Sequence, residues 1–284
     1  MIGKEYAQME NNNIHHLSNN KDYVDLLKEI GRVREFFSSY SFLQFGRDME
    51  FLLVSKQIIF RNGILVSSEQ TLGSIHSCCQ LGNFADVNIL LRKYRDDLFF
   101  YLYITVTARK QATQDKKATQ NIKSWIENNL DDLYIGEVLK TIGKSSNLSD
   151  AIEKYNLQKS FDQINTTLNG YVHAKGIKFY NKLFSHYQDD ELSTICKDIV
   201  SNLNHITTVF IFLSALCNPI SIMSTDYMDY RDMGDEPPSE SQYWVAPFIV
   251  EYLNANKSFL DENCIMFLQE QTNMQLDESL PNNT

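Results

Sequence analysis

Two segments of this sequence carry the side chains best suited to chemistry, and they lie far apart along the chain. Arginines can bind a phosphate or pair with a carboxylate, and a histidine can accept or donate a proton near neutral pH. Amide, phenol and amine groups can help to hold a substrate. The candidate residues are Arg92, Arg95 and Asp96 in the first segment and Asn169, Tyr171, His173 and Lys175 in the second.

The second segment belongs to a predicted helix with one apolar face and one polar row. Phe161 and Leu168 recur at helical spacing, whereas Asn165, Asn169 and His173 follow one another at intervals of four residues. Residues four apart lie on one side of a helix, so this row predicts a polar stripe that ends at the histidine. A helix that served packing alone would not need such a row.

The first segment places its charges beside another apolar stripe. Arg92 lies one helical turn before Asp96, where the two can form an ion pair, and Arg95 lies at the edge of the stripe. An inward-facing arginine needs a carboxylate or phosphate partner to offset the loss of its hydration. The plainer interpretation is structural: a surface ion pair worth roughly a few tenths of a kcal/mol, with Asn169 and His173 fixing the register of two helices.

Together the two segments resemble the HEPN (higher eukaryotes and prokaryotes nucleotide-binding) superfamily of helical domains. The family includes RNA-cleaving toxins, anti-phage effectors and inactive relatives, and the resemblance covers roughly residues 65 to 190. Its catalytic pattern is an arginine, usually followed by a polar residue, and then a histidine. Asn169 and His173 match the polar residue and the histidine, whereas Leu168 stands in the place of the arginine.

Some HEPN-like families lack this arginine and keep a Leu-x-Arg-x-x-x-acid helix with a Tyr-x-His segment. Leu90, Arg92, Asp96, Tyr171 and His173 look like that version. The resemblance implies that the histidine moves protons or holds phosphate while a ribose 2′-OH attacks the adjacent phosphorus without a metal. Arg92 or Arg95 would then supply the cation, Asn169 would assist, and Asp96, Tyr171 and Lys175 would contact the substrate.

Composition indicates a globular protein of a reducing compartment. The 284 residues are 43% hydrophobic, which is ample for a core, and they include seventeen Phe and fifteen Tyr. Five cysteines, an odd number, do not form a disulfide framework, and no apolar signal segment starts the sequence. We therefore expect a cytoplasmic protein. His76, Cys78 and Cys79 lack a second ligand pair, so we expect neither metal nor cofactor.

The spacing of proline and glycine predicts an all-α fold. The first proline is Pro219, and only ten glycines precede it, so few residues enforce a break in helix. We expect a helical bundle with a HEPN-like core and an acidic, aromatic C-terminal arm. The predicted helices span about 21–37, 40–60, 66–81, 83–108, 117–129, 132–143, 148–155, 157–174, 176–187, 190–217, 244–256 and 258–270.

Charge divides the chain into parts of different character. Residues 219–284 hold twelve acids and only Arg231 and Lys257 as bases, whereas the preceding residues are balanced. Asp226 to Ser241 reads as an acidic, turn-rich loop. We expect N-terminal helices packed on the core, the HEPN-like core itself, the acidic loop with the C-terminal helices, and a disordered tail. These four parts span residues 1–64, 65–218, 219–271 and 272–284.

Two functional hypotheses follow. The first is a HEPN-like protein of bacterial or mobile-element defence, a metal-independent endoribonuclease or nucleotide-binding effector, with RNA or a nucleotide as partner and a site shared by a homodimer. The second is a non-catalytic interaction module that binds a protein through its C-terminal arm. No membrane partner is expected, because the apolar stretch from Ile206 to Cys217 is too short to span a bilayer, which needs about twenty residues. Leu168 favours the second hypothesis, and the polar row ending at His173 favours the first.

Overall fold

The chain folds into an all-α structure, as the sequence predicts, with eleven α-helices among the described residues. The structure is a computed structural model. It describes residues 17, 19–45, 52–54, 57–59, 62–108, 116–129, 135–144, 146–181, 187–260 and 262–276.

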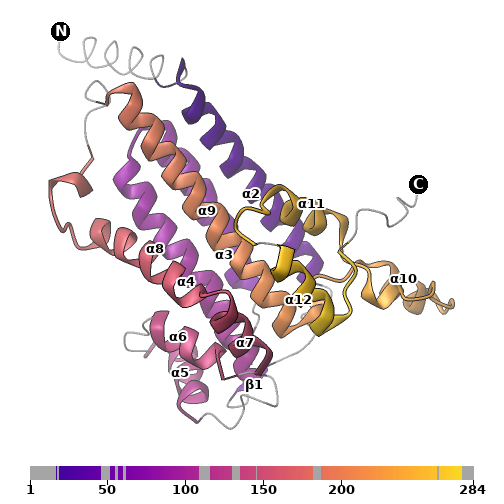
Figure 1. Ribbon diagram of the computed structural model, residues 1–284. Coiled ribbons are helices and arrows are strands. Elements are labelled where there is room, and N and C mark those ends of the chain that lie inside the picture. The colour runs from indigo at the N-terminus through magenta and orange to yellow at the C-terminus, as the bar shows by residue number, and fades with distance from the viewer. Residues whose placement is uncertain are drawn as a thin grey trace.

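Four long helices form the centre of the molecule (Figure 1). They are α2 (Lys21–Phe45), α3 (Asn62–Gln80), α4 (Phe84–Ala108) and α9 (Asp189–Cys217). α2 packs on α3 and α9, and α4 packs on the same two helices, so the four close into a ring. The buried aromatic residues of this ring meet at its axis. The Phe37 ring lies 5.6 Å from that of Tyr94 and 6.0 Å from that of Phe210.

Shorter elements surround this ring. They are β1 (Leu52–Val54), β2 (Gln57–Ile59), α5 (Lys116–Ile126), α6 (Ile135–Ile142), α7 (Ser146–Lys154), α8 (Leu157–Val172), η1 (Ile177–Phe179), η3 (Pro219–Ser221), α10 (Asp226–Met233), η4 (Ser241–Tyr243), α11 (Pro247–Ala255) and α12 (Glu262–Thr272). β1 and β2 pair antiparallel, with Leu52 opposite Ile59. α6 and α8 pack on α4, and α7 packs on α8 and α9.

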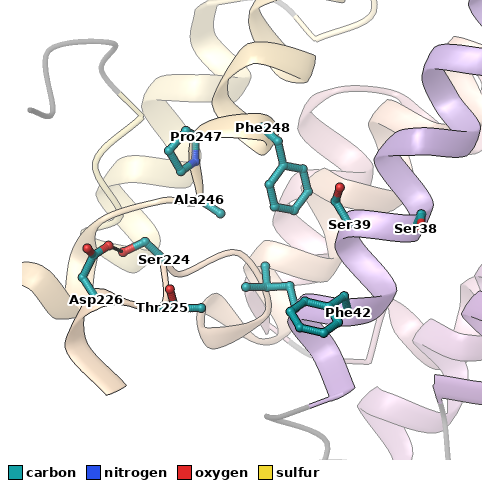
Figure 2. Close-up of a pocket in the computed structure, with 10 residues that line it drawn as sticks. Ser38, Ser39, Phe42, Ser224, Thr225, Asp226, Ala246, Pro247 and Phe248 are labelled. Carbon is teal, nitrogen blue, oxygen red and sulfur yellow. Dashed lines mark hydrogen bonds between the residues drawn. The ribbon is translucent and has the colours of Figure 1, made fainter. Parts of the chain in front are cut away.

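The C-terminal segments pack back onto α2 (Figures 1 and 2). The Tyr252 ring of α11 lies 4.6 Å from that of Phe36, and the Arg32 guanidinium lies 4.9 Å above the same tyrosine ring. Toward the C-terminal end of α2, the Gln44 side chain donates to the Ser221 carbonyl at 2.6 Å, and the Tyr40 hydroxyl lies 3.2 Å from Ser214 Oγ. Residues near both ends of the sequence therefore share one core.

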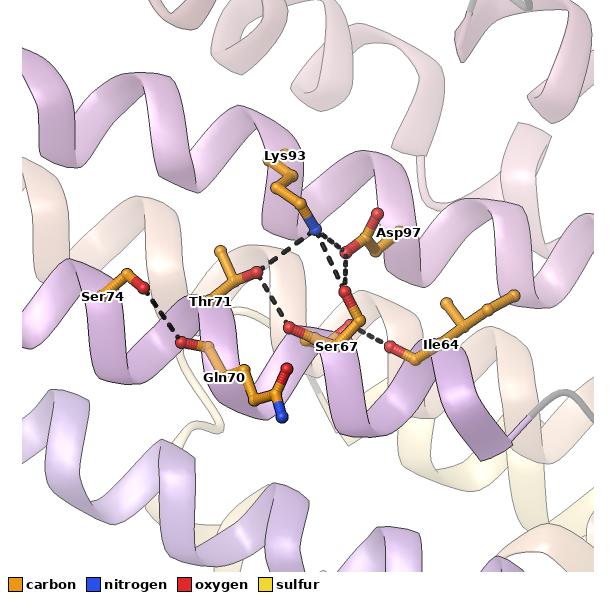
Figure 3. Close-up of polar contacts among 8 residues, drawn as sticks. Ile64, Ser67, Gln70, Thr71, Ser74, Lys93 and Asp97 are labelled. Atoms are coloured by element: carbon orange, nitrogen blue, oxygen red, sulfur yellow. Dashed lines mark hydrogen bonds and ion pairs between the residues drawn. The ribbon is translucent and has the colours of Figure 1, made fainter. Parts of the chain in front are cut away.

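Helix α4 is central because other helices, α3, α8 and α9 among them, pack around it. Consecutive residues of a helix point about 100° apart, so three in a row can reach three different partners. Lys93 faces α3, where its Nζ lies 3.2 Å from Ser67 Oγ, and it also pairs with Asp97 of its own helix (Figure 3). Tyr94 faces α9, where its hydroxyl lies 2.7 Å from Thr207 Oγ1. Arg95 faces α8.

The segment that follows α8 contacts both α8 and the start of α4. A Cβ at Gly170 would overlap the Phe179 ring of η1, so the absence of a side chain there lets the turn fold back on α8. Beyond η1, Asn181 Oδ1 accepts the Ala85 backbone N–H at 2.8 Å and thereby caps the start of α4. These contacts fix the position of the residues between Val172 and Asn181.

Some predicted helix boundaries are wrong. α2 is continuous through Ser38 and Ser39, where we predicted a break, because both serines face solvent and do not interrupt the helix. The helix predicted over 40–60 is instead the end of α2 followed by β1 and β2, a short apolar run that periodicity alone assigns poorly. In the helix predicted over 176–187, only η1 forms among the described residues, after Ala174 adopts a left-handed φ of 45°.

The acidic region also differs from the prediction. The expected loop from Asp226 begins with helix α10, whose first turn carries Asp226 and Asp229 and whose end is Gly234 at φ 80°. Carboxylates at the start of a helix and glycine at its end stabilise such a short element. Part of the predicted disordered tail is ordered, because Met274 is buried and the Gln275 N–H donates to the Tyr243 carbonyl at 2.8 Å. Residues 277–284 lie outside the described residues.

Helix α9 contains the most apolar stretch of the described chain. By length and composition α9 could span a membrane, but 78% of its most apolar window is buried inside the protein. Its residues contact α2, α4, α7 and α12. This packing matches the buried helix that the sequence predicted between Ile206 and Cys217.

Candidate functional site

Arg95 is the centre of a polar network between α4 and α8. Its side chain is only 1% exposed. Its Nε and Nη2 atoms both donate to Asp96 Oδ1, at 3.0 and 2.7 Å, and its Nη1 donates to Asn165 Oδ1 at 3.1 Å. The guanidinium therefore has charge-assisted hydrogen bonds that offset the loss of hydration on burial.

Arg92 approaches the other oxygen of the same carboxylate. Its Nε lies 3.6 Å from Asp96 Oδ2, and the two side chains are 30% and 44% exposed. This distance is too long for a good hydrogen bond, so the pair is held mainly by charge. Asp96 thus lies between two arginines, one buried and one facing solvent.

The orientation of the two asparagines of α8 follows from Arg95. A guanidinium can only donate, so the Asn165 atom that faces it is the carbonyl oxygen. The same oxygen accepts a hydrogen bond from Asn169 Nδ2 at 2.9 Å. Asn169 Oδ1 is then directed elsewhere, and it is buried without a hydrogen-bond partner among the described residues. A buried acceptor without a partner is costly, which makes this oxygen a candidate for contact with a ligand.

His173 follows this row at the end of α8. It is the C-cap residue, its backbone N–H donates to the Asn169 carbonyl at 3.0 Å, and its side chain is exposed. In the part of the chain that the structure describes, its imidazole makes no hydrogen bond or ion pair with another residue. The ring is therefore accessible to a substrate or to a second protomer.

Tyr171 and Lys175 lie away from the network. The Tyr171 ring packs edge-on against Phe179 at 5.1 Å, and burial, with Tyr187 and Asp198 nearby, raises the pKa of its hydroxyl. Tyr171 therefore faces η1 and α9, not α4. Lys175 is exposed in the turn, where its backbone N–H donates to the Gly170 carbonyl at 3.0 Å. The expected substrate contact by Tyr171 does not follow from this geometry.

Leu168 points into the core. Its side chain is 0% exposed, as part of the buried face of α8 with Phe161 and Ile164. The position at which the HEPN pattern has its arginine thus faces the protein interior here. The fold therefore joins Arg92, Arg95, Asp96 and Asn169 in one network, but it leaves His173, Tyr171 and Lys175 outside its hydrogen bonds.

A second polar site, which the sequence analysis missed, lies between α8 and α9. Ser160 Oγ lies 2.9 Å from His205 Nε2, at a pocket of about 270 Å³. The same hydroxyl donates to the Leu157 carbonyl at 3.0 Å, so its oxygen can accept the N–H of a neutral His205 ring protonated at Nε2. The pocket has no charged lining residue: its walls are Ser160, Gln163, Ile164, Thr167, Ser201, Asn202 and His205.

The environment of His205 keeps its ring neutral. Its imidazole meets the rings of Phe161 and Phe259 edge-on at 6.0 and 5.8 Å. Burial lowers the pKa of His205 below its ordinary value of 6.5, because burial disfavours the charged form. The only sequence signal was a histidine at the start of an apolar stretch, and such a residue does not reveal its partner on another helix.

The pKa of His205 predicts a pH dependence of stability. Between the lowered pKa and 6.5 the unfolded chain binds the proton more readily, so the free energy of unfolding falls as the pH drops through this range. We expect the melting temperature to decrease between about pH 7.5 and about pH 5.5. His205→Gln, which retains a hydrogen-bonding group without titrating, should weaken that decrease. An unchanged pH profile in the variant would contradict this assignment.

Comparisons with known protein families, curated proteins and solved structures find no match to this chain.

Proposed function

We propose that the chain is a HEPN-like helical protein of bacterial or mobile-element defence, acting in the cytoplasm on RNA or a nucleotide. Its core would span residues 65–218, which include the region of resemblance at roughly residues 65 to 190, with the acidic, aromatic C-terminal arm packed against it. The observation that carries the proposal is the network of Arg95, Asn165 and Asn169. It links the two segments that resemble the family and ends at a buried acceptor one turn before His173.

The network suggests a division of roles. Arg95 is buried, each of its three nitrogens donates a hydrogen bond, and it joins α4 to α8, so it would be a positioning residue that does not itself reach a substrate. Arg92 is the half-exposed cation and can turn from Asp96 to a phosphate. Asn169 Oδ1 can accept a hydrogen bond from a ribose hydroxyl or a base amine. His173 is the accessible acid–base group.

The reaction that fits these groups is transesterification of RNA. The ribose 2′-oxygen attacks the adjacent phosphorus, the bond from phosphorus to the 5′-oxygen breaks, and a cyclic phosphate and a free 5′-hydroxyl result. His173 would accept or supply a proton, and Arg92 would balance the charge that develops on the phosphate. A complete site would combine groups of two protomers, as in the family that the chain resembles.

The experiment measures cleavage of labelled single-stranded RNA in the presence of a chelator. His173→Ala and Arg92→Ala should each reduce the rate at least about 100-fold, the usual contribution of an acid–base or charge-stabilising group. Both side chains are partly or fully exposed, so the melting temperature should hardly change. His76→Ala and Arg34→Ala, which remove the same side-chain types from other helices, serve as matched controls.

The alternative is a non-catalytic interaction module. It is favoured by the burial and three hydrogen bonds of Arg95 and by the buried position of Leu168, because both fit a purely structural network. Under this alternative the wild-type chain neither cleaves RNA nor binds nucleotides, and the variants have no activity to lose. If light scattering shows that the chain is monomeric at micromolar concentration, the site cannot be shared by two protomers, and that part of the first proposal is wrong.

A further inference from the structure

A second cavity lies at the C-terminal end of α2, and none of its lining residues belongs to the network of Arg95 (Figure 2). It has a volume of about 500 Å³ and opens to solvent. Three segments form it: the last turns of α2, the start of α10 and the start of α11. Its lining residues are Ser38, Ser39, Phe42, Leu43, Ser224, Thr225, Asp226, Ala246, Pro247 and Phe248.

One side of the cavity is aromatic. Phe248 is half-buried and held in place, since its ring lies 5.5 Å from that of Phe36. Phe42 is 83% exposed, which is unusual for the largest apolar side chains in a folded protein. Figure 2 shows the two rings on the α2 side of the cavity. An exposed ring beside a cavity is available to stack on a planar or apolar group of a ligand.

The opposite side of the cavity is acidic. Asp226 is the first residue of α10 and accepts a hydrogen bond from Ser224 Oγ at 2.5 Å. Among the described residues no basic side chain forms an ion pair with it. Arg231 of the same helix donates instead to the Tyr227 hydroxyl at 3.1 Å. None of the lining residues is basic, so the carboxylate charge is not balanced within the cavity.

The C-terminal region around the cavity is also negatively charged. The chain from residue 219 onward carries twelve acids and two bases, and Asp229 and Asp232 are exposed along α10 beyond the cavity. A negative field of this kind attracts positively charged partners and repels RNA and other polyanions. The cavity therefore requires a ligand that combines a cation with a face able to stack on an aromatic ring.

We propose that this cavity takes an arginine side chain from a basic segment of a partner protein. The guanidinium is planar and weakly hydrated, so one face can stack on Phe42 while its N–H groups donate to Asp226. The hydroxyls of Ser38, Ser39 and Thr225 can accept the remaining N–H bonds. A lysine ammonium is a compact, strongly hydrated charge and fits this combination less well.

The test is fluorescence polarisation with three labelled peptides of one sequence. They contain arginine, lysine or citrulline, which retains the planar shape of arginine without its charge. We expect the arginine peptide to bind at least about tenfold more tightly than either of the others, a difference in keeping with one stacked, charge-assisted contact. Free arginine should compete with the peptide if the side chain alone is recognised, and should fail to compete if the surrounding peptide is needed.

Two substitutions test the two sides of the cavity. Phe42→Ala and Asp226→Asn should each weaken binding of the arginine peptide about tenfold, whereas Phe42→Trp should retain it, because tryptophan is the best ring for a cation. Asp232→Asn and Met233→Ala remove an exposed acid and an exposed apolar side chain from the same helix and should have less than a twofold effect. Melting temperatures would verify that all variants fold.

Several outcomes would overturn the proposal. They are equal binding of the lysine peptide, equal losses in Asp226→Asn and Asp232→Asn, and no binding of the arginine peptide to the wild type. Either of the first two results would show that the peptide binds only through general attraction between opposite charges. The inference is independent of the proposed ribonuclease, since RNA cleavage should be unchanged in Phe42→Ala and Asp226→Asn whatever the peptide result.

Discussion

Arg95→Ala is expected to lower the free energy of unfolding by about 3 kcal/mol, because it removes a buried, hydrogen-bonded side chain from between α4 and α8. The substitution would delete three hydrogen bonds and leave Asn165 Oδ1 without its strongest donor. The cavity left by the side chain adds to the loss. Thermal unfolding monitored by circular dichroism should show a melting temperature lower by roughly 6 °C or more.

Two further variants determine whether this loss comes from the network. Arg92→Ala removes a cation from the same carboxylate, but its pair is half-exposed, so we expect a change of less than about 1 kcal/mol. Arg95→Lys keeps the charge but cannot reach Asp96 and Asn165 together, so it should not restore stability. If Arg95→Ala and Arg92→Ala have equal effects, the assignment of Arg95 as the residue that fixes α4 against α8 is wrong.

Leu168→Arg is expected to be more destabilising still, by more than about 4 kcal/mol, because it buries an unpaired charge in the core. The sequence alone makes this substitution attractive, since it restores the arginine of the HEPN pattern. The structure places the side chain on the buried face of α8 with Phe161 and Ile164, and no aspartate or glutamate is buried among the described residues. The variant should unfold or aggregate on expression and should not gain an activity.

The matched controls for this prediction are close in sequence. Leu168→Met conserves volume and should cost less than about 1.5 kcal/mol. Thr166→Arg introduces the same charge two residues away on the exposed face of α8 and should change stability by about 0.5 kcal/mol at most. A folded Leu168→Arg protein with wild-type stability would show that α8 can rotate or shift to expose this position.

The sequence predicted the all-α fold class and the need of Arg95 for a hydrogen-bonding partner. Helical spacing identified α4, α8 and α9 almost to their ends, because long apolar stripes and terminal polar residues are local signals. The desolvation argument also correctly required a partner for Arg95, which is Asp96 together with Asn165. These conclusions need only the residues of one helix, or the rule that an apolar helix face and a buried charge must each contact another part of the protein.

The rest depends on how helices are arranged in space. Ser160 and His205 meet only because α8 and α9 pack in one particular register, and no spacing within either helix encodes it. His173 follows the polar row by sequence, yet the end of α8 turns its side chain to solvent. The same holds for the cavity beside Phe42, whose three segments come from separate parts of the chain.

The contacts between α2 and the C-terminal segments affect how the protein is made. Tyr40 and Ser214 are 174 residues apart, and Gln44 and Ser221 are 177 apart. At translation rates of about 5 to 20 residues per second, α2 leaves the ribosome roughly 10 to 35 seconds before these partners are synthesised. Until then α3 and α4 can cover only part of its apolar face, so the nascent chain exposes aromatic surface to chaperones, and the native core forms late in synthesis.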